Sequence, residues 1–258
     1  MKVNRIDTGK IKGDKLNVYF IGDFHVGSKD CNIDKIKEDI ATIKGDKNAL
    51  AIIMGDTCNC GLRNSVGAGS FDDLITPARQ MEDVIEMLMP IKDKIVGVHN
   101  GNHSNRVYNE TSLIPEKMIA KELGVPYLGD TCFHHMRFKN QTYILFTAHG
   151  STGSSSVGGS LNSCMKYRGF AQADLYAMGH THNLSTYAQI VYEIDRKDKT
   201  LTQKKKHYLL SGGYLEWKGS YAEQKNYAPL KLGCAMATFN GKEYDIEVKI
   251  WTYTKYWL

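Results

Sequence analysis

Five short apolar runs in this sequence each end in a motif of Asp, His or Asn, and this repetition constrains the fold more than any other feature. Five of the nine His in the chain belong to these motifs. The motifs follow one another at steps of about 30 to 50 residues, which is long enough for a βαβ crossover. Because ligands bind beyond the carboxyl ends of the strands in open α/β sheets, we expect five loops to meet at one rim. In chain order the motifs are Asp23-Phe24-His25, Gly55-Asp56, Gly101-Asn102-His103, His149-Gly150 and Gly179-His180-Thr181-His182.

The apolar patterns around these motifs predict alternating strands and helices, followed by two hairpins. Continuous apolar runs bounded by turn residues are typical of buried strands, and apolar residues three and four apart indicate helices. Strands are expected at Leu16–Gly22, Ala49–Gly55, Lys94–His99, Gln141–Ala148 and Asp174–Met178. Helices are expected after the first strand, where Ile33, Ile36, Ile40 and Ile43 recur, and at Asp73–Met89, Glu116–Leu123 and around Leu161–Phe170. The hairpins pair Ser185–Ile194 with Thr200–Leu210, and Ala235–Phe239 with Tyr244–Tyr253.

Composition narrows the class of protein. With 258 residues, 42% of them hydrophobic and 24% charged, the chain suits one globular domain, which we place at 1–258, and it excludes disorder and coiled coil as overall descriptions. The formal net charge of +5 permits polyanion binding without requiring it. No apolar stretch is long enough to span a bilayer, and Met1–Lys15 lacks the apolar core of a secretory signal. The six Cys include no CxxC pair, so we expect a reducing, cytoplasmic setting and no membrane partner.

The residue types in the five motifs indicate metal binding. A mixed set of carboxylate and imidazole ligands suits first-row divalent metals better than Mg²⁺ alone. The candidates outnumber what one ion needs, and a two-metal site with one shared carboxylate accounts for them. The candidate ligands are Asp23, His25, Asp56, Asn102, His149, His180 and His182.

On these motifs the sequence resembles the calcineurin-like metallophosphoesterase superfamily. The motifs DxH, GD, GNH, a single H and GHxH are all present in that order, between Asp23 and His182. The stretch Ser211–Gly233 is also similar to the tail of phage and prophage members. The resemblance implies a four-layer α-β-β-α sandwich with two mixed sheets, in which the C-terminal hairpins extend the second sheet.

The resemblance also implies a role for each motif residue. One divalent transition-metal ion would be held by Asp23, His25, Asp56 and His182, and a second by Asp56, Asn102, His149 and His180. Manganese is expected first, with iron, zinc or nickel as alternatives. A hydroxide shared by the two metals would attack phosphorus in line, and His103 would act as the general acid that protonates the leaving oxygen.

Two departures from the family pattern bear on the reaction. Ser104 stands directly after GNH, where many members have an acidic residue. Phosphoprotein phosphatases place an Asp and then an Arg where this chain has Asn59 and Cys60. These changes weaken the interpretation as a protein phosphatase, and they leave the partner of His103 unassigned.

Other residues have a functional and a plain structural interpretation. Arg106 is a candidate phosphate clamp or a surface salt-bridge residue, and Arg63 and Arg168 are weaker candidates of the same kind. The segment Ser151–Ser160 is either a surface excursion or an active-site flap. The basic segment Lys204–Lys206 is a solvated hairpin or a nucleic-acid contact, and His134 and His135 are structural. Trp217, Tyr214 and Tyr221 line a substrate rim or pack in the core.

Three functions remain open from the sequence. The first is a phosphodiesterase acting on nucleic acid or nucleotides, favoured by the basic charge, the missing phosphatase-type pair and the phage-like tail. The second is a phosphomonoesterase acting on a nucleotide or a phosphoprotein. The third is a binding scaffold without catalysis, for which loss of metal ligands would be expected. The oligomeric state is left open.

Overall fold

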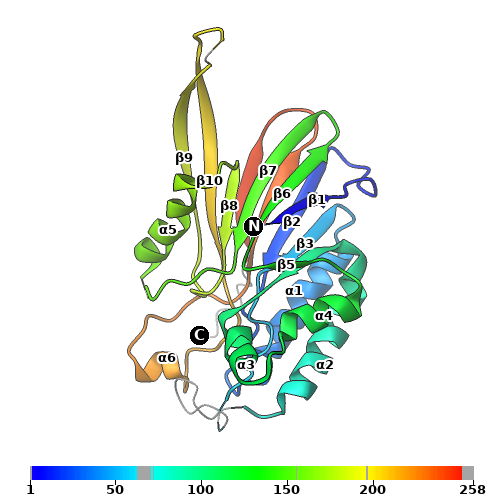
Figure 1. Cartoon of the computed structure of the whole chain (residues 1–258), viewed down its shortest axis with the longest axis vertical. Helices are drawn as coiled ribbons and strands as arrows, with labels where there is room; N and C mark the ends of the chain where they lie inside the picture. The colour runs from blue at the N-terminus through cyan, green and yellow to red at the C-terminus, as the bar shows by residue number, and fades with distance from the viewer. Residues whose placement is uncertain (1, 63–70, 72, 155, 196, 252–258) are drawn as a thin grey trace, which may run out of the picture.

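The apolar strands assemble into two six-stranded mixed sheets (Figure 1). The computed structural model describes residues 2–62, 71, 73–154, 156–195 and 197–251. The first sheet has the order β12-β11-β2-β3-β4-β5, in which β2 to β5 run parallel and β11 is antiparallel to both of its neighbours. Its strands are β2 (Lys15–Ile21), β3 (Ala49–Ile53), β4 (Ile95–His99), β5 (Tyr127–Gly129), β11 (Cys234–Asn240) and β12 (Ile246–Trp251).

The second sheet has the order β1-β6-β7-β8-β10-β9. Here β1 is parallel to β6, β8 is parallel to both β7 and β10, and the pairs β6–β7 and β9–β10 are antiparallel. Its strands are β1 (Lys2–Ile6), β6 (Thr131–Phe138), β7 (Gln141–Ala148), β8 (Leu175–Met178), β9 (Leu184–Ile194) and β10 (Leu201–Ser211).

The strands bury side chains on both faces, and this explains their continuous apolar runs. On β3, Leu50 and Ile52 join the core between the two sheets, whereas Ala51 and Ile53 join the core under the helices. Successive side chains of a strand point to opposite faces, so a strand covered on both sides needs apolar residues at every position. The same division holds on β7, where Leu145 faces the other sheet and Phe146 faces outward.

Helices cover the outer face of each sheet, which completes the expected α-β-β-α layers. Three helices pack on the first sheet, through residues such as Ile36, Val84 and Ile119. Helix α5 (Val157–Met165) packs on the second sheet, through Cys164 and Leu161. The helices on the first sheet are α1 (Ile33–Gly45), α2 (Pro77–Leu88) and α4 (Pro115–Leu123), with α3 (Asn102–Thr111) near the rim.

Three sequence expectations need correction. The second helix begins at Pro77 rather than at Asp73, because the Thr76 side chain caps it, and Leu74 lies outside it with 74% of its surface exposed. The helix expected around Leu161–Phe170 begins earlier, at Val157, and its last part is a 3₁₀ turn, Lys166–Gly169.

The third correction concerns the hairpins. Only β9–β10 extends the second sheet, whereas β11–β12 extends the first, since β11 pairs with β2 with Ala235 opposite Phe20. This placement covers an edge of β2 that would otherwise present unpaired backbone groups.

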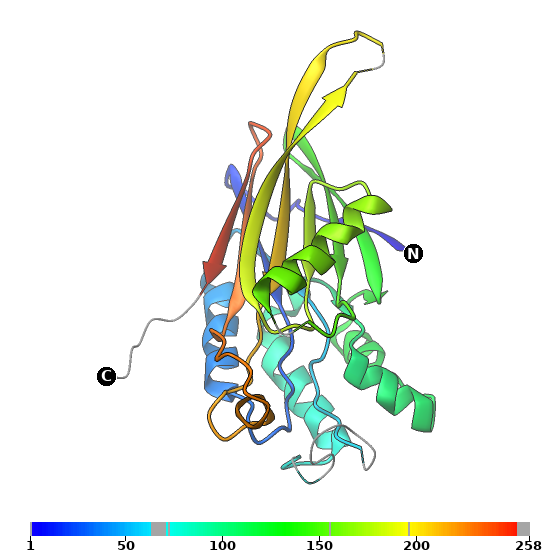
Figure 2. The same ribbon diagram turned by 90° about the vertical axis from the view of Figure 1, so that its left-hand side faces the viewer.

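The β9–β10 hairpin projects beyond the rest of the molecule in both views (Figures 1 and 2). Lys204 and Lys206 on this hairpin are already paired within the chain, with Glu193 at 2.7 Å and Asp174 at 3.3 Å. Because of these ion pairs the positive charge of this segment is partly neutralised, and Lys206 is only 5% exposed. None of the helices in the described ranges has the length and apolar character that crossing a membrane requires.

Candidate metal centre

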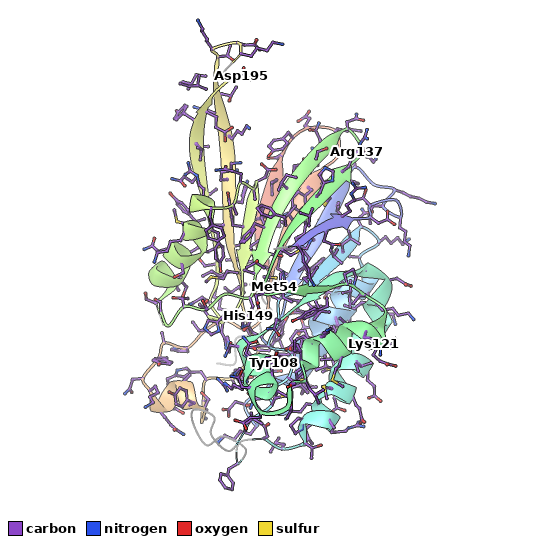
Figure 3. The ribbon with its side chains drawn as sticks, in the orientation of Figure 1. Met54, Tyr108, Lys121, Arg137, His149 and Asp195 are labelled. Atoms are coloured by element: carbon purple, nitrogen blue, oxygen red, sulfur yellow. The ribbon has the colours of Figure 1, made fainter. Side chains whose placement is uncertain are left out.

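The five motifs meet where the carboxyl ends of strands from both sheets come together. Strands β2, β3 and β4 of the first sheet lead into Asp23 and His25, Asp56, and the start of α3. Strands β7 and β8 of the second sheet lead into the other two motifs. Figure 3 shows His149 beside Met54, at the junction of the two sheets. The single rim expected from the sequence is therefore formed by two sheets.

The backbone turns sharply at most of the candidate ligands. A positive φ is uncommon outside Gly, and such residues cluster at functional sites. Five of the seven candidate ligands have a positive φ: Asp23 (52°), His25 (50°), Asp56 (46°), His180 (67°) and His182 (53°).

One group of ligand atoms comes from Asp23, His25 and His182, all lying within 4.8 Å of one another. The Nε2 atoms of His25 and His182 are 3.0 Å apart, and His182 Nε2 is 3.6 Å from Asp23 Oδ1. The backbone N–H of His180 donates to both oxygens of Asp23, at 3.1 and 3.0 Å, and this fixes the carboxylate. These are three of the four residues expected around the first metal.

A second group comes from Asp56, His149 and His180, again within 4.8 Å. Asn102 belongs with them, because its Oδ1 lies 3.0 Å from His149 Nε2 and 2.8 Å from His180 Nδ1. These four residues are the set expected around the second metal.

Asp56 lies between the two groups. Its Oδ2 is 3.2 Å from His149 Nε2 and 4.0 Å from His25 Nε2, and its carboxylate is almost fully buried. Its Oδ1 accepts a hydrogen bond from the backbone N–H of His103 at 2.9 Å. This position suits a carboxylate shared by two cations.

The electrostatics of the centre favour an added positive charge. Burial raises the pKa of Asp23 to about 8, and the nearby Asp56 adds to this. Burial also disfavours the charged form of Asp56, but the His149, His103 and His25 rings hold its pKa well below its usual range. Burial lowers the pKa of His25 well below its usual range and that of His182 to about 4, so both rings are neutral at pH 7, the form that binds metals.

His149 is the exception among these rings. Burial disfavours its charged form, but the Asp56 carboxylate raises its pKa to about 10. A cation between the two residues would replace this proton, since metal binding releases protons from its ligands.

The orientation of His149 fits a metal ligand. Its Nδ1 donates to the carbonyl of Met54 at 2.8 Å, so Nε2 faces the oxygens of Asn102 and Asp56. Such a hydrogen bond from the second ring nitrogen is the usual way in which proteins orient a ligating His. With a neutral ring, a lone pair of Nε2 would face two oxygen acceptors, and a cation relieves that repulsion. The chemistry of the residues present therefore fits metal binding.

His103 lies beside the first group, and its partner is a backbone atom. Its ring packs edge-on against His25, with centroids 4.5 Å apart, and its Nδ1 donates to the carbonyl of Asn59 at 2.5 Å. The Asn59 side chain is held in turn by Asp73 at 2.5 Å. Asn59 occupies the position at which phosphoprotein phosphatases have an Asp. Here the backbone carbonyl of Asn59, and not its side chain, orients His103. No sequence motif encodes such a backbone contact.

The arginines expected near phosphate differ in their placement. Arg106 lies on α3, one turn after Asn102, and is partly buried. Arg168 contacts Gln189 of β9 at 3.2 Å. Arg63 lies outside the described residues.

The aromatic candidates divide between core and rim. Tyr214 is fully buried, and its hydroxyl donates to Asp39 at 2.6 Å. Trp217 and Tyr221 line a cavity next to His180 and His182. The adjacent His pair on β6 behaves as expected, because His134 is buried and His135 is exposed on the opposite face.

Gly213 was not anticipated as part of the site. A Cβ at this position would lie 3.0 Å from the side chain of His182 and 3.4 Å from that of Asp23, so the close approach needs Gly. The Gly212-Gly213 pair, just after the short apolar run Tyr208–Leu210, was the available signal. The loop at 151–154 also lines the cavity beside His180, whereas the residues from Val157 onward belong to α5.

No protein-family model and no curated protein matches the chain. A conserved protein from Streptococcus pneumoniae TIGR4, described as a predicted phosphoesterase, is 11% identical with a TM-score of 0.42, over 93% of this chain and 94% of that one. Vacuolar protein sorting 29 from Cryptosporidium parvum is 14% identical with a TM-score of 0.46, over 93% and 100%. The NAD nucleotidase of Haemophilus influenzae is 10% identical with a TM-score of 0.45, over 91% of this chain and 49% of that one. These values carry no inference about activity, so the functional conclusion depends on the site itself.

Proposed function

We propose that the chain is a dinuclear metal-dependent phosphoesterase that hydrolyses phosphodiester bonds in nucleic acid or nucleotides. The observation that supports this most directly is the position of the buried Asp56 carboxylate, whose Oδ2 lies 3.2 Å from His149 Nε2 and 4.0 Å from His25 Nε2. Asp23, His25, Asp56 and His182 would hold one divalent transition-metal ion, with manganese expected first. Asp56, Asn102, His149 and His180 would hold the other. Bound there, the two ions would supply Lewis-acid activation of water and of the phosphoryl oxygens.

His103 is the proposed general acid. Its Nδ1 is engaged by the Asn59 carbonyl, which leaves Nε2 as the atom that transfers a proton to the leaving oxygen. The residue is partly exposed and can be reprotonated from solvent. Its ring contacts that of His25, and a ring nitrogen lies within 4.8 Å of ligand atoms of His25 and Asp56, so a phosphoester bound there would be within its reach.

Two features favour a diester over a monoester. A monoester carries more negative charge, and phosphatases of this kind supply an extra Arg for it, but Cys60 occupies that position here and is buried. At the preceding position, where such phosphatases have an Asp, the Asn59 side chain donates a hydrogen bond to Asp73. The net charge of +5 also suits a polyanionic substrate.

The decisive experiment compares two chromogenic substrates on the manganese-loaded chain. We expect bis-p-nitrophenyl phosphate to be hydrolysed with a higher kcat/KM than p-nitrophenyl phosphate. The His103→Ala variant should retain both metals but lose about 10²- to 10⁴-fold in kcat, because it lacks the proton donor. The matched control is His135→Ala on the exposed face of β6, which should behave like the parent.

A clear preference for the monoester would replace the diesterase proposal with a phosphomonoesterase. A metal-loaded chain without turnover on either ester would favour a binding scaffold. Full activity of His103→Ala would remove the catalytic assignment of that residue.

A further inference from the structure

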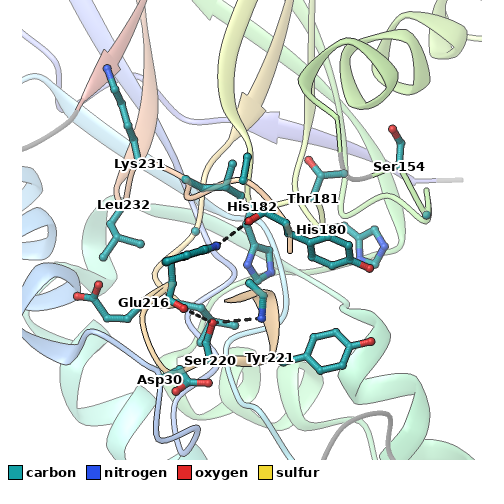
Figure 4. A pocket seen from close by; sticks show the side chains of 18 of the residues that line it. Asp30, Ser154, His180, Thr181, His182, Glu216, Ser220, Tyr221, Lys231 and Leu232 are labelled. Carbon is teal, nitrogen blue, oxygen red and sulfur yellow. Dashed lines mark hydrogen bonds between the residues drawn. The ribbon is translucent and has the colours of Figure 1, made fainter. Parts of the chain in front are cut away.

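A cavity of ≈280 Å³ opens directly beside two of the candidate metal ligands, His180 and His182 (Figure 4). One side is formed by the loop at 151–154 that follows β7, and the other by the segment 213–232 between β10 and β11. A phosphoester bound at these ligands could therefore place one of its organic substituents in this cavity.

The segment 213–232 is a closed excursion fixed to the metal-binding loops. Its ends are joined by a hydrogen bond from the Gly233 N–H to the Gly213 carbonyl, at 3.1 Å. Leu215 forms a bridge with Cys31, and the Glu216 N–H donates to the Asp30 carbonyl at 2.8 Å, just after the first motif. The cavity wall thus keeps a defined position relative to Asp23 and His25.

The wall presents aromatic rings. The indole N–H of Trp217 donates to the carbonyl of Tyr227 at 2.7 Å, and the Tyr221 and Tyr227 rings lie 6.4 Å apart in an edge-on arrangement. Tyr221 and Tyr227 nevertheless remain 37% and 45% exposed. Exposed rings held in place around a cavity are surfaces on which a planar group can stack.

Polar groups of the cavity lie around this aromatic surface. Lys231 and the hydroxyl-bearing residues Thr152 and Ser154 line it together with the apolar Leu215 and Leu230. An apolar and aromatic pocket with a few polar groups is typical of a small-molecule site, and the volume of this one is just below the range of about 300–1,000 Å³ for such sites. A single planar heterocycle meets this description better than a duplex or a protein segment.

We propose that this cavity binds the nucleobase of a nucleoside whose phosphodiester lies at the metal centre. This inference rests on the proposed phosphodiesterase function and narrows its substrate class to nucleotide esters. Base stacking on aromatic side chains tolerates different bases, so we expect selectivity for a nucleoside over a small alkyl group rather than for one base.

The test uses two diesters with the same leaving group. Thymidine 5′-(p-nitrophenyl phosphate) and methyl p-nitrophenyl phosphate both release p-nitrophenolate, and they differ only in the substituent that would enter the cavity. We expect the metal-loaded parent to favour the thymidine ester in kcat/KM by at least about 10-fold, the factor expected from one stacked base. Tyr221→Ala should lower kcat/KM for the thymidine ester about 10-fold more than for the methyl ester, mainly through KM.

A binding measurement complements the kinetics. Calorimetric titration with thymidine 5′-monophosphate should show weaker binding to Tyr221→Ala than to the parent. The matched control is Tyr192→Ala, an exposed tyrosine on the projecting β9, which should leave both esters and the titration unchanged.

The outcomes separate the two proposals. Equal kcat/KM for both esters in the parent, or an equal effect of Tyr221→Ala on both, would overturn the nucleobase site and leave the phosphodiesterase standing. Hydrolysis of neither ester would overturn the phosphodiesterase and the nucleobase site with it.

Discussion

At Gly101 the metal centre has no room for a side chain. A Cβ at this position would lie 2.0 Å from Asp56 Oδ1 and 2.4 Å from the Asp56 backbone nitrogen. The φ of Gly101 is −131°, which any residue can adopt, so the requirement for Gly is purely steric. Gly101 thus allows the third motif to lie directly against the Asp56 carboxylate.

Gly101→Ala should therefore weaken metal binding by about 10- to 100-fold, as loss of a supporting interaction around a metal ligand commonly does. The measurement is a manganese titration with metal content determined after dialysis. Gly158→Ala is the matched control, because a Cβ in that part of α5 meets nothing within 4 Å. Unchanged affinity in Gly101→Ala would show that Asp56 can move without loss of the site.

At the scale of elements, four strands, β4 to β7, are tied together by a buried chain of hydrogen bonds. His134 of β6 contacts Thr147 of β7 at 2.7 Å, and the same hydroxyl contacts His99 of β4 at 2.6 Å. His99 in turn contacts the Gly129 carbonyl at 2.8 Å. Burial lowers the pKa of His134 to about 3 and that of His99 to about 4, so both rings are neutral in the folded chain.

These two rings should make the folded chain less stable as pH falls from about 6.5 to 4. The unfolded chain takes up their protons first, near the ordinary His pKa of about 6.5, so the free energy of unfolding rises with pH in this window and levels off above it. In His134→Gln, urea unfolding with a chelator present should show a slope lower by up to about 1.4 kcal/mol per pH unit. The neighbouring exposed His135→Gln should keep the parent slope; an unchanged slope in His134→Gln would contradict the prediction.

Elements differ in how well the sequence predicts them. Strands β3 and β7 were predicted nearly to the residue, because burial on both faces requires continuous apolar runs. The edge strand β1 was missed, since its residues are mostly exposed and polar. Helix α3 was missed too, because Asn102–Thr111 has little apolar periodicity and is placed by the motif that begins it.

At the scale of the whole molecule, the centre joins the two sheets. Asp23, Asp56 and Asn102 come from the first sheet, whereas His149 and His180 come from the second. The sequence indicated these residues as candidate ligands, but strand patterns alone did not say which sheet each strand joins or that two rims face each other. The Asn59 carbonyl beside His103 was beyond prediction because it depends on backbone position. The cavity wall was predicted only in part: a substrate rim was one of two alternatives for Trp217 and Tyr221.

Metal binding should consequently stabilise the whole chain. A ligand at 100 times its Kd adds about 2.7 kcal/mol per site, which corresponds to roughly 5–10 °C in Tm for a chain of this size. Thermal unfolding with manganese and then with excess chelator should show this difference. Asp56→Asn, which weakens both groups of ligands, should show a much smaller one; an equal shift in that variant would place the stabilising ion elsewhere.

The projecting β9–β10 hairpin is a suitable position for attaching a label to the chain. Asp195, near its tip, lies at the top of the view in Figure 3, well away from His149. Exposed loop tips of this kind tolerate insertions well. An affinity tag or a fluorophore placed there would attach the chain to a surface through a segment that is remote from the candidate metal ligands, and would leave their surroundings unobstructed.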